Sequence, residues 1–273
     1  MDRRTLLWTV VAVIAVAALA AGGWAIVHTR AGDSGSTPIA DASATWAPSP
    51  TPTSSPSEQP ERNHWTVAKL TRRIAVYAKP RSDSRIRMYL PATTDDGQVA
   101  RVCLVRHSYE YAGQAWYNVY LGTKPNGSRG WISERGIILY PVYSRILIDT
   151  SRRKLTVIGG DGKVLARFPV CVGMSSAPTP VGEFFVSEKI AISPPSPGYG
   201  VLALAISAFS PSSEIQQLFA ASGGQVAIHG VGTPAGDSSI GQALSHGCIR
   251  LHNKDILAVS KLVVTGSPVT IRQ

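Results

Sequence analysis

A histidine and a cysteine near the end of the chain are the residues best suited to do chemistry. His229 lies nineteen positions before Cys248, and Gly247 directly precedes the cysteine. A thiol attacks well only as its thiolate, so a catalytic cysteine needs a nearby base or cation, partial exposure and a small neighbour that admits substrate. His229 can supply the base, and glycines in the intervening loop allow it to return to the cysteine. The pattern predicts nucleophilic catalysis by a thiol.

The residues around Cys248 can support such a reaction. The Gly247 and Cys248 amides can donate to the oxyanion of a tetrahedral intermediate, an interaction worth about 3 kcal/mol per donor. On a strand, Arg250 would point to the same side as Cys248, where it can bind a substrate carboxylate or brace the loop. His246 has two interpretations that the sequence leaves open: support of the thiolate, or a structural role with a hydrogen bond.

The segment from about residue 142 onward has the pattern of a mainly antiparallel β domain, which would position these residues. Apolar runs between turn residues predict six strands, over Ile146–Asp149, Lys154–Ile158, Val164–Val172, Phe184–Ser187, Val201–Ala208 and Val269–Arg272. A further strand, Gln225–Ile228, would deliver His229 at its tip.

Two short helices complete the predicted domain. One has Ser210 as its N-cap, Pro211 at its first position and Gly223 just past its end. The other is capped by Asn253 and stopped by Gly266.

Residues 63–140 have a different pattern, that of a small all-β barrel. Short β-rich runs predict strands over Ile74–Tyr77, Ile86–Leu90, Val99–Val105, Trp116–Leu121 and Trp131–Leu139. Three short runs resemble bacterial SH3-like modules: Val76–Tyr77 with the following Pro80, Trp116–Val119 and Gly130–Ile132. Such a module either binds a ligand of the cell wall or serves as a spacer and packing partner for the next domain.

The N-terminal segment predicts export. Thr5–Val27 contains no charged residue, and its 23 residues would span about 34 Å as a helix, enough to cross a hydrocarbon core. Arg3 and Arg4 would stay cytoplasmic and place the rest of the chain outside. The alternative is a cleaved signal peptide, with an apolar segment over Leu6–Ala17 and an A-x-A site at Ala18–Ala20. We favour the transmembrane anchor, and both interpretations export the protein.

The predicted organisation has four parts. A membrane anchor or signal over residues 1–30 is followed by a linker over 31–62, which is rich in Pro, Ser and Thr and lacks apolar periodicity. The β module then covers 63–140 and the catalytic domain 141–273. The protein would be a single-pass protein of the cell membrane with its C-terminal domains outside, or a secreted protein if the N-terminal segment is cleaved.

Charge and cysteine content narrow the function further. The formal charge of +10 favours an anionic surface such as phospholipid or a polyanionic wall, but no basic run with interleaved aromatic residues indicates nucleic acid.

Exported chains usually pair their thiols, and three cysteines leave at least one unpaired. Cys103 and Cys171 lie in apolar runs, where we expect small buried side chains, whereas Cys248 lies among Ser, His and Gly.

Roughly the C-terminal half of the chain resembles a known family. Four runs carry the similarity to the L,D-transpeptidase catalytic (YkuD-type) domain: Pro178–Phe184, Tyr199–Leu204, Ile228–Gly230 and Ser245–Asn253. The resemblance covers about residues 142–273 and implies a β-rich fold special to that family, with Cys248 as nucleophile and His229 as general base and acid. A backbone carbonyl or a serine orients the histidine in this family. Here we favour the Gly230 carbonyl over the Ser245 hydroxyl.

The resemblance implies that peptidoglycan peptide stems are donor and acceptor. The Cys248 thiolate would attack the carbonyl of the third stem residue, and D-alanine would leave with a proton from His229. A side-chain amine of a second stem would then take the acyl group and form a cross-link. Water in its place would make the enzyme an L,D-carboxypeptidase. Neither reaction needs ATP, a metal or a cofactor, and we expect a carbapenem to add covalently to Cys248.

Two other classes of protein remain as alternatives. Four side chains are possible zinc ligands: His229, His246, Cys248 and His252. The His-x-Cys spacing is unlike the usual zinc patterns, and no carboxylate is placed to activate a zinc-bound water. A non-catalytic wall-binding protein would explain the charge but would leave the histidine and the thiol without a role.

Overall fold

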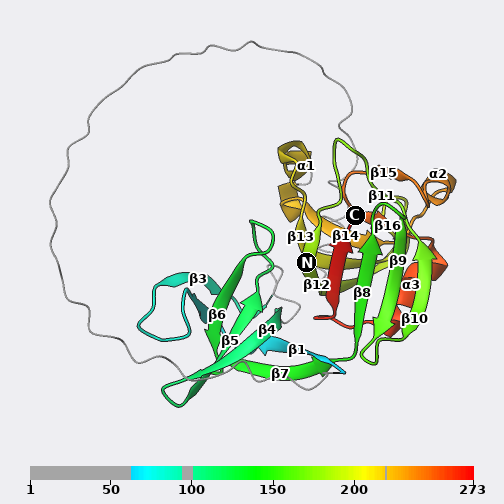
Figure 1. Ribbon diagram of the computed structural model, residues 1–273. Helices are drawn as coiled ribbons and strands as arrows, with labels where there is room; N and C mark the ends of the chain where they lie inside the picture. The colour runs from blue at the N-terminus through cyan, green and yellow to red at the C-terminus, as the bar shows by residue number, and fades with distance from the viewer. Residues whose placement is uncertain (1–62, 94–100, 219) are drawn as a thin grey trace, which may run out of the picture. The chain divides into compact units, whose positions relative to one another are not determined.

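The structure is a computed structural model that describes residues 63–93, 101–218 and 220–273 (Figure 1). The predicted membrane anchor and the linker lie outside the described residues. Within the described ranges, no helix has the length and apolar character needed to cross a membrane. Two sheets account for most of the described chain.

The first sheet has seven strands, all formed by residues before 143. They are β1 (Trp65–Leu70), β2 (Ile74–Tyr77), β3 (Ile86–Leu90), β4 (Val102–Tyr111), β5 (Gln114–Tyr120), β6 (Arg129–Ser133) and β7 (Ile137–Val142). Their order is β3-β2-β6-β5-β4-β1-β7, and all pairings are antiparallel. Alternate residues, among them Val76, Val119 and Ile132, enclose one apolar cluster.

The second sheet has eight strands and contains the segment with the candidate catalytic residues. They are β8 (Ser144–Asp149), β9 (Lys154–Gly159), β10 (Val164–Pro169), β12 (Gly182–Ser196), β13 (Gly200–Phe209), β14 (Gln225–His229), β16 (Ile249–Arg250) and β17 (Pro268–Arg272). Their order is β10-β9-β8-β17-β12-β13-β14-β16, and β17 pairs in parallel with β8 while β16 pairs in parallel with β14. Two short strands, β11 (Val172–Gly173) and β15 (Ala243–Ser245), form a separate parallel pair.

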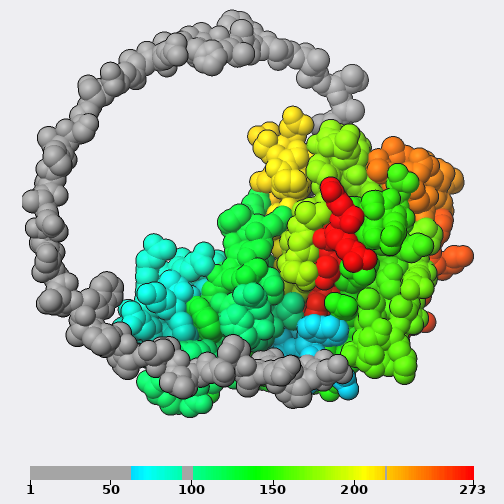
Figure 2. All heavy atoms as spheres, viewed as in Figure 1, coloured from blue at the N-terminus to red at the C-terminus, as the bar shows by residue number. Residues whose placement is uncertain are grey.

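Short helices follow or connect these strands. They are α1 (Ser213–Leu218), a 3-10 turn η1 (Ala220–Ser222), α2 (Pro234–Ser238) and α3 (Asn253–Leu262). Ile256 and Val259 of α3 are fully buried in the apolar core of the second sheet, together with Ile228 and Ile249. The short α2, in orange, lies at the molecular surface, and β17, in red, runs between the strands of the second sheet (Figure 2).

The prediction of a mainly β fold with few helices is confirmed, but several boundaries were wrong. The run over Trp131–Leu139 is two strands, because Gly136, with φ +85°, turns the chain between them. Strand β10 ends at Pro169 rather than at Val172, since Cys171 leaves it to pair with Arg250. Strand β1 was not predicted.

The helices also differ from expectation. The first begins at Ser213, and the Ser212 hydroxyl, rather than that of Ser210, accepts from the Ile215 amide inside it. The N-cap of α3 is His252, because the Asn253 side chain is engaged elsewhere. Helix α2 was not predicted and makes three α-helices in the described chain instead of two; its Thr233 cap accepts from the Gly236 amide.

The two sheets pack against each other. Phe185 of β12 is buried in a cluster with four residues of the first sheet: Val67, Val102, Leu104 and Val142. The side-chain amide of Asn126 donates to the Phe209 carbonyl oxygen at 2.7 Å and accepts from the Phe209 amide at 2.9 Å. The first sheet is therefore a packing partner of the second, whatever else it binds.

Candidate functional site

Strands β14 and β16 bring the segments that contain His229 and Cys248 side by side. The strands run parallel, with Ile228 opposite Ile249 and His229 opposite Arg250. Both isoleucines are fully buried in the core, so the alternate side chains point to the other face. Cys248 lies directly before β16, where the Ala227 backbone and the Arg250 charge both act on its thiol. Ala227 lies two residues before His229 on β14, so Cys248 is beside the end of β14 that carries His229.

Burial leaves both groups uncharged at neutral pH. Loss of water lowers the pKa of the His229 imidazole from 6.5 to about 4; the hydrogen bond to Gly230 opposes this effect, and the Arg250 charge adds to it. Loss of water also raises the pKa of the Cys248 thiol, against smaller opposing effects of a hydrogen bond from the Ala227 backbone and of the Arg250 charge. Both pKa shifts favour a neutral thiol and a neutral imidazole before substrate binds.

The Gly230 carbonyl orients the His229 ring. Its oxygen lies 2.6 Å from Nδ1. Because a carbonyl only accepts, Nδ1 carries the proton and Nε2 remains as the basic nitrogen. The Ser245 hydroxyl, the other group considered from the sequence, donates to the Cys248 carbonyl oxygen at 2.5 Å and accepts from the Gly247 amide at 3.1 Å.

The Gly247 amide is therefore already engaged. As a donor to an oxyanion, the role expected from the sequence, it would first have to leave the Ser245 hydroxyl. The sequence did not reveal this hydrogen bond, because its acceptor, Ser245, lies only two residues before Gly247 in a loop whose shape the sequence does not determine. Gly247 has φ +112°, a backbone conformation that favours glycine and sets the direction of the Cys248 side chain.

Thr179 fastens the loop that carries Gly247 and Cys248 to the sheet. Its buried hydroxyl donates to the Gly247 carbonyl oxygen at 3.0 Å and accepts from the Gly173 amide at 2.9 Å. Prolines on both sides of Thr179 restrict the backbone around it. This explains the Thr-Pro run that the sequence analysis singled out only by resemblance.

Thr179→Val is expected to loosen the nucleophile while keeping the shape of the side chain. The Gly173 amide and the Gly247 carbonyl would lose their partner, which costs about 1–3 kcal/mol for a buried group, as urea unfolding would show. Misplacement of the sulfur should slow acylation about tenfold or more. Thr179→Ser should restore both quantities, and wild-type acylation by Thr179→Val would show that Thr179 does not position Cys248.

Tyr199 is a site residue to which the sequence analysis gave no role. Its ring centroid lies 4.7 Å from that of His229, with the ring planes at 53°. Burial, and then the charge of an ionised Cys248, raise the pKa of the Tyr199 hydroxyl, while Arg250 lowers it. Tyr199 and Arg250 are therefore both close enough to respond to charge on the sulfur. An aromatic residue before a glycine gives no distinct signal in the sequence.

Two glycines let Asn253 approach the site. A Cβ on Gly200 or on Gly230 would collide with Oδ1 of Asn253, which accepts from the Val201 amide at 3.1 Å. Gly230 therefore has two roles: its carbonyl orients His229, and its lack of a side chain admits Asn253. Gly200 additionally has φ +64°.

His246 and His252, the other two histidines near Cys248, do not form a metal site with its sulfur. His246, two positions before Cys248, is exposed, and the His252 Nδ1 lies 2.7 Å from Asp237 Oδ1 of α2. Within residues 63–93, 101–218 and 220–273, no group of three or more His, Cys, Asp or Glu side chains is arranged to hold a metal ion. Cys103 and Cys171 are buried free thiols.

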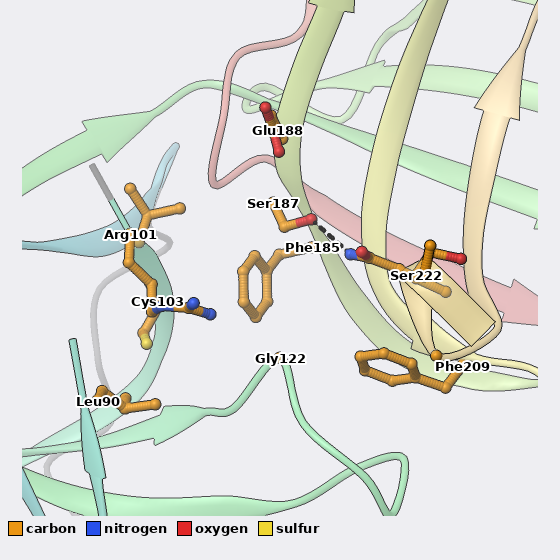
Figure 3. Close-up of a pocket in the computed structure, with 13 residues that line it drawn as sticks. Leu90, Arg101, Cys103, Gly122, Phe185, Ser187, Glu188, Phe209 and Ser222 are labelled. Atoms are coloured by element: carbon orange, nitrogen blue, oxygen red, sulfur yellow. Dashed lines mark hydrogen bonds between the residues drawn. The ribbon is translucent and has the colours of Figure 1, made fainter. Parts of the chain in front are cut away.

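A separate cavity of about 480 Å³ lies between the two sheets (Figure 3). Phe185 projects into its middle, with Arg101 and Cys103 on one side and Phe209 and Ser222 on the other. None of the candidate catalytic residues lines this cavity, so it is distinct from the site around the cysteine.

Comparisons with known proteins agree on one family for this part of the chain. The family model of the L,D-transpeptidase catalytic domain (YkuD) matches residues 143–271. The chain is 31% identical to YkuD of Bacillus subtilis (strain 168) over 134 residues, which cover 49% of this chain and 69% of that protein. It is 33% identical to YkuD of Bacillus licheniformis over 129 residues, 46% of this chain and 64% of that protein.

Solved structures show similarity as well. L,D-transpeptidase 3 from Mycobacterium tuberculosis, in complex with a faropenem-derived adduct, aligns with 75% of this chain and 95% of its own, at 14% identity and a TM-score of 0.41. All the site residues described above, from Thr179 to Asn253, lie inside the segment that the family model matches.

Proposed function

This chain belongs to the L,D-transpeptidase catalytic domain (YkuD) family, and we propose that it cross-links peptide stems of peptidoglycan through a thioester on Cys248. The observation that carries the proposal is the pairing of β14 with β16, which sets His229 opposite Arg250 and beside the strand that Cys248 directly precedes. A buried imidazole held at Nδ1 by Gly230 leaves Nε2 for proton transfer, which acylation of a neutral thiol requires.

The first half-reaction acylates the sulfur. As the Cys248 sulfur attacks the carbonyl carbon of the third stem residue, His229 Nε2 takes the thiol proton, so the neutral pair becomes charged only during attack. The tetrahedral intermediate then collapses, and the imidazolium returns the proton to the amine of the departing D-alanine. The products are free D-alanine and a thioester of the tripeptide stem.

The second half-reaction transfers the acyl group. A side-chain amine of another stem attacks the thioester carbonyl while His229 removes a proton from that amine. The thiol leaves with the same proton, and an amide cross-link forms between the two third residues. Water in place of the amine would release the tripeptide, which is carboxypeptidase activity at the same site.

Arg250 is the residue we propose for substrate binding. It lies opposite His229, and its charge acts on both the His229 imidazole and the Cys248 thiol, so its guanidinium is close to the reacting atoms. A stem that ends in D-alanine presents a carboxylate, and guanidinium groups bind carboxylates well. The same charge would also stabilise a thiolate as it forms.

A defined donor and acceptor test the proposal. The full chain, incubated with disaccharide tetrapeptides, should release D-alanine and form dimers linked between third residues, as liquid chromatography with mass spectrometry would detect. Release of D-alanine with only tripeptide products would make the enzyme a carboxypeptidase. Failure to release D-alanine from stems with any common diaminoacid would contradict both activities.

The proposal extends to the place of the enzyme in the cell. We propose that residues 1–30 anchor the chain in the cell membrane, with the β1–β7 module, interpreted as SH3-like, and the catalytic domain outside. The support is the uncharged Thr5–Val27 segment behind Arg3 and Arg4. Fractionation of cells that make the full chain would test it: recovery of a shortened chain in the medium would indicate a cleaved signal.

A further inference from the structure

The outer face of β4, β5 and β6 carries a cluster of aromatic side chains. Strand pairing places His107, Asn118 and Trp131 in one row, and Tyr109 and Trp116 in the next. Cross-strand partners point to the same face, and the alternate residues of β5 and β6 lie in the buried apolar cluster on the other side. We call these five residues the aromatic face.

The rings of the aromatic face contact one another, and the Tyr109 ring reaches solvent. The Trp131 ring lies 5.5 Å from that of His107 and 6.2 Å from that of Tyr109, both edge-on. Trp116 meets Tyr77 of the neighbouring β2 in the same way at 5.3 Å. Tyr109 is 42% exposed. Such rings offer flat apolar surfaces on which the CH faces of a sugar can stack.

Two buried polar atoms on this face lack a hydrogen-bond partner among the described residues: Trp116 Nε1 and Asn118 Oδ1. Trp116 is 2% exposed and Asn118 is 8% exposed, and they lie two residues apart on the same face of β5. Buried polar atoms are nearly always paired, so this unpaired donor and this unpaired acceptor on one face of β5 mark a place where a ligand group can bind. A secondary amide, with one N–H and one carbonyl, supplies both partners.

The surroundings of the aromatic face are basic. Burial, and then the charges of Arg106 and Arg129, lower the pKa of His107, which places both guanidinium groups close to it. The Arg129 guanidinium also stacks over the Tyr120 ring at 5.1 Å. Residues 63–142 contain twelve Lys and Arg against five Asp and Glu, so this segment holds +7 of the formal charge of +10. A surface of this kind attracts polyanions.

From these observations we infer that the aromatic face binds a glycan built of acetamido sugars that carry carboxylates. Trp131 and Tyr109 stack on the sugar rings. An acetamido group pairs with the Trp116 and Asn118 side chains once the rings above them turn aside, and Arg129 attracts the carboxylates. This site would hold the polysaccharide, whereas the proposed chemistry at Cys248 acts on peptide, so the inference stands without that activity.

Calorimetric titration of the full chain with glycan strands stripped of their peptide stems tests the inference. Tyr109→Ala should weaken binding about fivefold, and Trp131→Ala about tenfold or more, as expected for aromatic anchors. Arg129→Ala should reduce the dependence of affinity on salt. Tyr143→Ala is the matched control, because Tyr143 is an exposed tyrosine, at 62%, outside the aromatic face.

Two comparisons separate this binding from other causes. Polyglutamate, which has the charge without the sugars, should bind at least tenfold more weakly than the glycan strands. The rate of covalent addition to Cys248 should be the same in Tyr109→Ala as in wild type, which separates glycan binding from catalysis and from unfolding. Equal affinity of wild type, Tyr109→Ala and Trp131→Ala for the strands would overturn the inference, as would polyglutamate binding as tightly.

Discussion

Cys248→Ala is expected to lower the release of D-alanine from tetrapeptide stems by at least about a thousandfold, because the acyl group then has no nucleophile to receive it. It should also abolish covalent addition of a carbapenem, whose strained lactam traps an attacking thiol. Intact-mass spectrometry measures the second effect directly. The fold should be unchanged, since Cys248 is only partly buried as a residue and does not belong to the apolar core of the second sheet.

Cys103→Ala provides the matched control for the carbapenem experiment. Burial raises the pKa of the Cys103 thiol to about 12, so this sulfur stays protonated and inert at neutral pH. Wild type and Cys103→Ala should both gain the mass of one carbapenem. A gain of the same mass by Cys248→Ala would place the nucleophile elsewhere.

His229→Gln is expected to lower the same rate by about a hundredfold to ten thousandfold, the usual contribution of a general base and acid. The pH dependence of kcat/KM should show whether His229 and Cys248 are both neutral before attack. Because burial lowers the pKa of His229 to about 4, the base form persists from neutral pH down to that value. The wild-type kcat/KM should therefore stay level on the acidic side and fall only near pH 4.

Alkylation of Cys248 by iodoacetamide distinguishes a neutral pair from a preformed thiolate. A thiol whose pKa is raised should react slowly at pH 5 to 8 and faster as pH increases above 9. A thiolate held by an imidazolium would instead react at a constant high rate from about pH 5 upward. A plateau of that kind, lost in His229→Gln, would contradict the neutral pair although it would leave the nucleophile unchanged.

Much of the sheet could be predicted from alternating apolar residues. Strands β2 and β3 begin and end where the sequence indicated, because turn residues border them on both sides. Strand β16 could not be predicted, since two residues carry no periodicity and this strand exists only through pairing with β14. Helix α2 is likewise too short and too polar to be seen in the pattern.

The types of the candidate catalytic residues were readable from the sequence, but their protonation was not. His229 and Cys248 stand out by type and spacing, whereas the shift of each pKa depends on burial that only the packed strands create. The same limit applies to Ser245. The sequence offers this hydroxyl as one of two groups that could orient His229, and only the loop geometry shows that it contacts the Gly247 amide and the Cys248 carbonyl.

The most direct test of the account is to trap the acyl-enzyme. The full chain, mixed with a tetrapeptide stem without an acceptor amine and quenched in acid within milliseconds to seconds, would be weighed intact and then mapped as peptides. We expect a mass gain equal to the tripeptide acyl group, on the peptide that contains Cys248, and far less of it in His229→Gln. Steady release of D-alanine with no acyl group on Cys248 at any time would contradict the account.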